Sequence, residues 1–252
     1  MNTFIKNNNL LIGKQINLAY DPNKLVLVYD TSKEPANNTV TFPVNGASPN
    51  ITVDWGDGTS DTYTTTGFKT HTYASPGIYI VQAAGILRAF SFGSGASGTN
   101  NKLKLIGCLS FGNVLITSLL DGFRNCSNLI QAPSLLPTTS AITNLGACFN
   151  GCTNFNYPIN NWNISSVVTL ANTFTNASSF NQPLNNWNTS AINNFSSTFA
   201  NATSFNGNIS NWTIRNIGTV NMTSMFNGAS SFNQNINSWN TSNVTSMNSM
   251  FA

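Results

Sequence analysis

Aromatic residues recur at a fixed interval through the second half of the chain. A Phe-Asn dipeptide begins at Phe155 and returns three times, at spacings of 25, 25 and 27 residues, and a tryptophan follows each copy. A unit of about 25 residues with so few apolar positions cannot close a core alone, but it can when it stacks on copies of itself. The pattern predicts about six stacked repeats over residues 103–252. A structural ladder of rings would hold them: Phe123, Phe149, Phe174, Phe199, Phe226, Phe251, Trp162, Trp187, Trp212 and Trp239.

The residues before the repeats have the pattern of a small all-β unit. Short β-branched runs at Thr39–Val44 and Ile51–Trp55 predict strands, and Tyr79–Ala83 predicts another. The sequence Gly56-Asp57-Gly58 has the composition of a tight turn, because glycine tolerates a positive φ angle. We therefore expect a small β-sandwich over residues 25–90.

The remaining N-terminal segments are assigned from their composition. Residues 1–24 alternate apolar with polar side chains, which predicts an N-terminal arm or an extra strand that docks onto something else. Residues 91–102 are rich in serine and glycine, which predicts either a flexible connector between the sandwich and the repeats or a loop at their junction. The expected fold class is mainly β, with the domains in the order arm, sandwich, connector and repeat region.

The chain is poor in charged residues and rich in asparagine. Charged side chains make up 7% of the 252 residues, whereas 43 residues are asparagine, and after Arg124 only Arg215 is charged. Stacked repeats explain both features, because a repeated charge would lie over the same charge in the next repeat, whereas asparagine amides form hydrogen-bonded ladders.

The repeats lack the titratable groups of acid–base catalysis and the paired carboxylates of a glycosidase. The net charge of +3 includes no basic cluster for nucleic acid. We expect no enzyme activity, no cofactor and no nucleic-acid partner.

The two ends of the chain each leave alternatives open. Apolar runs such as Leu25–Tyr29 are far shorter than the ~20 residues that a bilayer requires, so we expect no membrane insertion. The N-terminal apolar stretch is too short for a secretory signal, so either a signal was removed before Met1 or the protein leaves its cell without one. Phe251 and Ala252 fall within a repeat, so either the chain continues past them or another subunit covers this uncapped end. The second alternative favours a homo-oligomer.

Two of the four cysteines are one repeat apart. Cys126 and Cys152 are separated by 26 residues and would lie on adjacent coils, where a disulfide is one alternative. The other is that they are small apolar fillers, because later repeats hold Ala177, Ala202 and Ala229 in the same position.

Asp54, Asp57 and Asp61 form the densest acidic cluster and are a weak candidate for a calcium site. The competing interpretation is that Asp57 caps its own turn by accepting bonds from backbone N–H groups. His71 is the single histidine and has no nucleophile motif beside it. We expect it to pack or to form a hydrogen bond near the turn that contains Asp57.

Two stretches of sequence resemble known families. The stretch Trp187–Phe199 and its copies, with Asn-Asn-Trp-Asn-Thr-Ser followed by Phe-Ala-Asn-Ala, resemble the repeats of BspA-like leucine-rich-repeat surface proteins, and residues 142–152 resemble the leucine-rich variety. Asp54-Trp55-Gly56-Asp57-Gly58 with His71–Tyr79 resembles PKD-type domains. The resemblance implies an immunoglobulin-like sandwich followed by a right-handed, leucine-rich-repeat-like β-solenoid. It also implies adhesion, on bacterial surfaces or in phage and other virion proteins, and no enzymatic activity.

The expected function is therefore that of a non-enzymatic adhesion or structural protein. Its leading form is a virion component, a tail or capsid fibre that presents a rigid rod for host attachment. The alternatives are a bacterial cell-surface adhesin and a self-assembling extracellular filament or lattice subunit. Expected partners are other virion or surface subunits, bound through the N-terminal arm and the C-terminal end, and a host receptor or glycan. The four repeat tryptophans are assigned to the core rather than to a sugar-binding surface.

Overall fold

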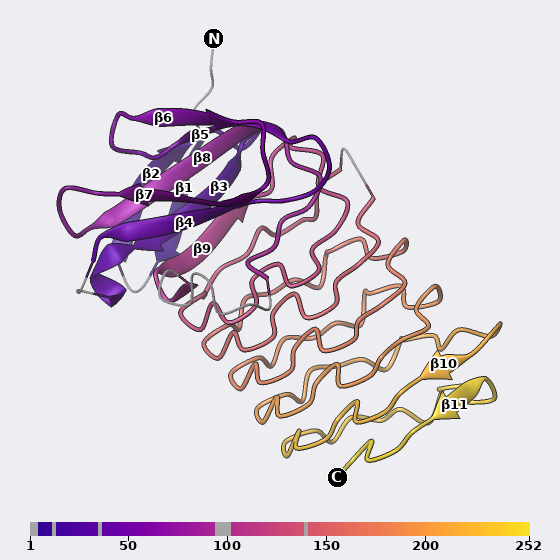
Figure 1. The fold of residues 1–252 in the computed structure, drawn as a ribbon. Helices are drawn as coiled ribbons and strands as arrows, with labels where there is room; N and C mark the ends of the chain where they lie inside the picture. The colour runs from indigo at the N-terminus through magenta and orange to yellow at the C-terminus, as the bar shows by residue number, and fades with distance from the viewer. Residues whose placement is uncertain (1–4, 12–13, 35–36, 94–101, 139–140) are drawn as a thin grey trace.

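The computed structural model describes residues 5–11, 14–34, 37–93, 102–138 and 141–252, with side chains from residue 19 onward. Within these ranges the protein is mainly β, as predicted, and contains no α-helix. A group of antiparallel sheets forms the N-terminal part, and a series of similar coils follows it (Figure 1). None of the described helical turns is long or apolar enough to cross a bilayer.

The N-terminal part is built around one five-stranded antiparallel sheet and a separate two-stranded one. The large sheet has the strand order β6-β5-β8-β3-β9, and β4 pairs with β7 in the small one. Runs predicted as strands coincide with β4, β5 and β8. The bounds are β3 (Leu25–Asp30), β4 (Thr39–Val44), β5 (Asn50–Asp54), β6 (Ser60–Tyr63), β7 (Gly67–Thr72), β8 (Ile78–Ile86) and β9 (Leu105–Ser110), with a short 3-10 helix at Thr31–Lys33 after β3.

Side chains from both sheets meet in one core. In β3, Leu25, Leu27 and Tyr29 point into this core, while the residues between them face the other side of the sheet, as the two-residue period of a strand requires. The hydroxyl of Tyr29 donates a hydrogen bond of 2.7 Å to the Thr41 carbonyl, which ties β3 of the large sheet to β4 of the small sheet. Packing between the two sheets is therefore reinforced by a buried polar contact.

The segment predicted as an arm folds back on its own chain. Strands β1 (Ile5–Leu11) and β2 (Lys14–Tyr20) pair antiparallel with each other, and β2 contacts β8. Tyr20, at the end of β2, is buried with Val26 and Val28 on the second face of the large sheet. The apolar residues on that face supply the surface on which the segment docks, so its partner in this structure is internal. Residues 1–4 and 12–13 of the predicted arm lie outside the described residues.

Strand β9 belongs to both parts of the molecule, which differs from the predicted boundary at residue 103. On one side β9 pairs with β3. On the other side it bonds to the first repeat, because Ile130 N–H donates to the Ile106 carbonyl at 3.0 Å and Cys108 N–H donates to the Gln131 carbonyl at 3.0 Å. The strand is therefore the edge of the sheet and the first rung of the repeats.

The predicted connector is also partly buried. Phe92 is buried, as is Phe90 just before it, and Phe90 lies 5.2 Å from the ring of Phe123 in the first repeat. Lys102 is buried as well, and its ammonium donates to the Gly93 carbonyl at 2.9 Å. Residues 94–101 of the predicted connector lie outside the described residues. The core of the sheets continues into the core of the repeats without a break.

Each repeat is bonded through its backbone to the next one. The N–H of Phe149 donates to Thr173 at 2.9 Å, and the N–H groups of Phe174 and Phe199 make the same bond one repeat further on. Parallel bridges link equivalent residues of successive coils, and the last two form the short strands β10 (Val220–Asn221) and β11 (Val244–Ser246). These coils, residues 116–252, are called the repeat stack below, and they lie side by side in Figure 1.

Each repeat turns through two residues with positive φ, four positions apart. Asparagine and glycine adopt this conformation most easily, which gives asparagine a second role in the repeats. Gly151 has a φ of 73°, which glycine adopts without strain, and a β-carbon there would press on the amide of Asn125 unless that side chain moved. The pairs are Asp121 and Asn125, Ala147 and Gly151, Asn172 and Asn176, Ser197 and Asn201, and Ser224 and Gly228.

Candidate functional site

The phenylalanines predicted to form a ladder lie over one another. Their centroids are 5.4 to 5.6 Å apart from one repeat to the next, and no two neighbouring rings are inclined by more than 14°. All are buried except Phe251, which is 61% exposed. The column consists of Phe123, Phe149, Phe174, Phe199, Phe226 and Phe251.

A second phenylalanine column runs beside the first. The first rings of the Phe-Asn dipeptides, Phe155, Phe180, Phe205 and Phe232, stack at 5.8 to 5.9 Å. Rings of the two columns contact each other within a repeat at 3.9 to 4.2 Å. These phenylalanines were visible as a sequence marker but were not assigned to the ladder, because spacing does not tell which marker faces the core.

The tryptophans form a third column inside the stack. Trp187 and Trp212 are 6.2 Å apart and Trp212 and Trp239 are 6.3 Å apart, with nearly parallel rings. Trp162 lies 5.6 Å from Phe149. The four side chains are between 1% and 9% exposed. They present no open face on which a sugar ring could stack.

The indole N–H groups bond to the preceding repeat, with one exception. Trp162, Trp187 and Trp212 donate to backbone carbonyls at 2.8, 3.0 and 2.8 Å. Each acceptor lies three residues before the equivalent position of the preceding repeat; for Trp212 it is Leu184. The indole nitrogen of Trp239 is buried and has no partner among the residues that the structure describes. The three bonded indoles hold the register between coils.

Asparagine side chains form ladders of two kinds. The predicted amide-to-amide type occurs between Asn201 and Asn176, whose side chains are bonded at 3.1 Å. In another column the side-chain oxygen accepts the backbone N–H of the next repeat, as Asn156 does from Asn181 at 2.9 Å and Asn181 does from Asn206 at 2.7 Å. The second type satisfies a backbone donor that would otherwise lack a protein partner.

Two carboxylates of the predicted calcium candidate serve local bonds. Asp54 accepts the backbone N–H of Gly56 at 2.9 Å. Asp61 accepts the indole N–H of Trp55 at 2.8 Å and the Tyr63 hydroxyl at 3.2 Å. Across the part of the chain that the structure describes, no group of three or more His, Cys, Asp or Glu side chains is placed to hold a metal ion. Local hydrogen bonds within this turn thus account for the positions of Asp54 and Asp61.

Asp57 caps its turn and anchors the histidine. One carboxylate oxygen accepts the backbone N–H of Thr59 at 3.0 Å, and the other lies 2.7 Å from Nε2 of His71. Partial burial raises the pKa of Asp57, but the bonds from Thr59 and His71 outweigh it and hold the pKa below its usual value. The ring of His71 stacks on Trp55 at 4.9 Å. This arrangement is a packed turn, and it leaves no nucleophile beside the imidazole.

The cysteines are free thiols inside the core. Cys126 and Cys152 are unpaired and buried, and they occupy the position that Ala177, Ala202 and Ala229 fill in later repeats. Burial raises the pKa of the Cys152 thiol, which donates to a backbone carbonyl at 3.0 Å. In this structure they are the small fillers that one of the two alternatives describes.

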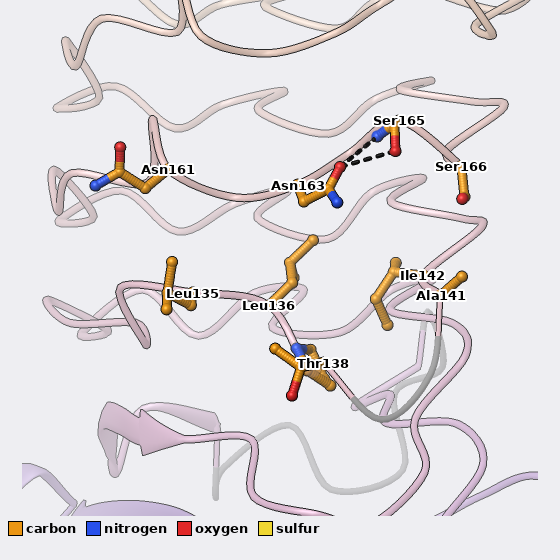
Figure 2. A pocket seen from close by; sticks show the side chains of 10 residues that line it. Leu135, Leu136, Thr138, Ala141, Ile142, Asn161, Asn163, Ser165 and Ser166 are labelled. Carbon is orange, nitrogen blue, oxygen red and sulfur yellow. Dashed lines mark hydrogen bonds between the residues drawn. The ribbon is translucent and has the colours of Figure 1, made fainter.

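A lateral groove opens on the side of the stack, and sequence reasoning did not find it. It has a volume of about 480 Å³ and lies between two groups of described residues, 135–138 with 141–142 on one side and 161–166 of the next repeat on the other. Leu135, Leu136 and Ile142 form its apolar floor. Figure 2 shows Asn161, Asn163, Ser165 and Ser166 along its other side.

The groove coincides with a departure from the repeat sequence. Each later repeat has a tryptophan in the middle of the three positions that Leu135-Leu136-Pro137 occupy here, and in three of the four an asparagine precedes it. Leu135 is 57% exposed, in the column that Asn161 and its copies occupy. A second cavity of about 300 Å³ shares residues 135–138 and extends toward Ser110. The missing tryptophan was the available signal for a distinct surface at this repeat.

We expect Phe174→Ala to lower the free energy of unfolding by about 3–5 kcal/mol, because it removes a ring stacked on both sides and leaves a cavity. Phe68→Ala is the control, since Phe68 is 39% exposed, and it should cost less than about 1 kcal/mol. Chemical denaturation measures both. Equal losses in the two variants would contradict the buried column.

The unequal bonding of the indoles gives a second prediction. Trp212→Phe and Trp239→Phe remove similar ring area, but only the first removes a buried hydrogen bond. Trp212→Phe should therefore cost about 1 kcal/mol more in unfolding free energy than Trp239→Phe. Thermal and denaturant unfolding of the two variants provide the comparison, and a larger loss for Trp239→Phe would refute it.

Comparison with known proteins identifies the repeat stack. The family described as "Mycoplasma protein of unknown function, DUF285" matches residues 117–221 and 218–252, more than half of the chain. This family is found in BspA-like surface proteins, which agrees with the resemblance of the repeats. The match does not reach the N-terminal sheets, so it carries no information on their resemblance to PKD-type domains. Searches of curated proteins and of solved structures returned no match. The chain belongs to the DUF285 family.

Proposed function

We propose that this protein is a non-enzymatic cell-surface adhesin. In this proposal the N-terminal sheets are an immunoglobulin-like sandwich of the PKD type, and the repeat stack is a right-handed solenoid that presents a binding surface. The occurrence of the family in BspA-like surface proteins supports a surface location. The family's occurrence in surface proteins favours the adhesin over the virion fibre and over the filament. These two alternatives remain predictions from the sequence.

The observation that carries the proposal is the continuity of the core. Buried side chains extend from β3 through Phe90 and Phe123 into the last repeats as one cluster. A binding surface that is supported by such a core is already ordered in the unbound protein. Less conformational entropy is then lost on binding, and a weak set of contacts suffices for attachment.

The outer surface of the stack supports the same proposal through its chemistry. From residue 105 onward the only charged side chains are Asp121, Arg124 and Arg215. Asp121 and Arg124 neutralise each other at 2.9 Å. Besides single exposed apolar side chains such as Leu135 and Ile217, the stack offers a partner amide and hydroxyl groups, which suit a neutral polar surface and tolerate changes in salt concentration.

The test is attachment to cells by beads that carry the full chain. Beads coated with the native protein should attach to host cells several times more than beads coated with the Phe174→Ala variant, whose stack is destabilised. Antibodies against the chain should also label intact source cells. Background attachment by native beads, together with labelling only after the source cells are permeabilised, would contradict the proposal.

A further inference from the structure

We infer that the lateral groove binds a neutral saccharide. This inference rests on the proposed function and names the chemical class of the receptor that the adhesin would recognise. The groove's volume of about 480 Å³ falls within the range of about 300–1,000 Å³ that is usual for small-molecule sites. Its two sides differ in chemistry, and each side fits a different part of a sugar ring.

The floor supplies apolar contact. Leu136 and Ile142 are buried at its base, and Leu135 projects from it with more than half of its side chain exposed. An exposed leucine in a column that otherwise holds asparagine and serine is costly in water, and a ligand that covers it recovers part of that cost. The C–H face of a pyranose ring has the right character to lie against these side chains.

The opposite side supplies hydrogen-bonding groups that the protein does not use. The side chain of Asn163 accepts bonds from the backbone N–H and hydroxyl of Ser165, at 3.2 and 2.8 Å, and these bonds fix its orientation (Figure 2). Among the described residues, no hydrogen bond is made by the amide nitrogen of Asn163. The side chains of Asn161 and Ser166 likewise form no hydrogen bond within the described residues. Donors and acceptors that are held in place and unpaired suit ring hydroxyls.

Charge decides between ligand classes. None of the residues that line the groove or its 300 Å³ extension carries a charge. Phosphate, carboxylate and sialic acid groups would lose water there without gaining a cation in return. An uncharged ligand avoids this cost.

A peptide strand fits the groove less well. Strand addition needs a free backbone edge. Next to the groove, Val168 N–H already donates to Thr143 at 3.0 Å, and Thr143 N–H donates to Thr117 at 3.0 Å. The free groups are side-chain amides and hydroxyls, whose partners in a sugar are hydroxyl groups rather than a regular backbone.

The experiment uses the full chain and an array of neutral and sialylated oligosaccharides. The neutral oligosaccharide that gives the strongest signal is then titrated by calorimetry into the wild-type chain and three variants. Asn161→Ala removes one free amide. Leu135→Asn removes the exposed part of the floor, and it gives position 135 the residue that the next three repeats hold. Asn211→Ala is the matched control, because Asn211 occupies the equivalent position two repeats away.

We expect neutral oligosaccharides to bind, with affinity about tenfold lower for Asn161→Ala and Leu135→Asn and unchanged for Asn211→Ala. Binding restricted to sialylated glycans, no binding to any glycan, or equal losses in Asn161→Ala and Asn211→Ala would overturn the inference. Circular dichroism of each variant confirms that it is folded.

The bead assay separates this inference from the proposed function. Native beads that attach to cells although the protein binds no glycan would refute the saccharide site and leave the adhesin in place. Glycan binding without attachment would support the site and refute the adhesin. Attachment that is lost in Leu135→Asn but survives glycosidase treatment of the cells would assign the groove to a protein partner and overturn the saccharide inference.

Discussion

Stacking of like on like is the constraint on which the rest of the structure depends. The ring of Phe174 lies 5.6 and 5.4 Å from the equivalent rings of the two neighbouring repeats. The backbone N–H of Phe174 donates to the next coil. Burial of one such ring contributes roughly 1.5–3 kcal/mol. The same geometry places each of the remaining side chains beside the equivalent side chain of the next repeat. A charged residue would therefore be repelled by the same charge in the next repeat. The shortage of charge and the abundance of asparagine therefore follow from the stacking.

A stack of this kind needs a first coil, and the N-terminal sheets provide it. Strand β9 satisfies the backbone of β3 on one side and of the first repeat on the other. Without it the first repeat would expose unpaired backbone groups and a ring to water. The buried pair Phe90 and Phe92 closes the same junction with apolar contact. The sheets and the repeats form one folded unit, which is what makes the side of the stack a fixed surface.

Sequence reasoning succeeded where the structure is periodic and failed where it is not. Regular spacing identified the columns of Phe174 and Trp187, because only a stack explains rings at one interval. The double role of β9 depends on pairing with β3, some 80 residues earlier, and no local pattern reports such a contact. The connector was assigned from serine and glycine, which do not report that its described ends at Phe92 and Lys102 are buried. The groove lies where Leu136 replaces the tryptophan of the later repeats. A search for recurring residues does not detect a position at which the recurring residue is absent.

Backbone hydrogen exchange tests the central claim most directly. If equivalent rings stack and successive coils share backbone bonds, the amides of Phe149, Phe174 and Phe199 will exchange as slowly as those of β3, through opening of the same core. If those amides instead exchange as fast as exposed turn amides such as that of Thr66 while β3 stays protected, the coils are not stacked and this account of the protein is wrong.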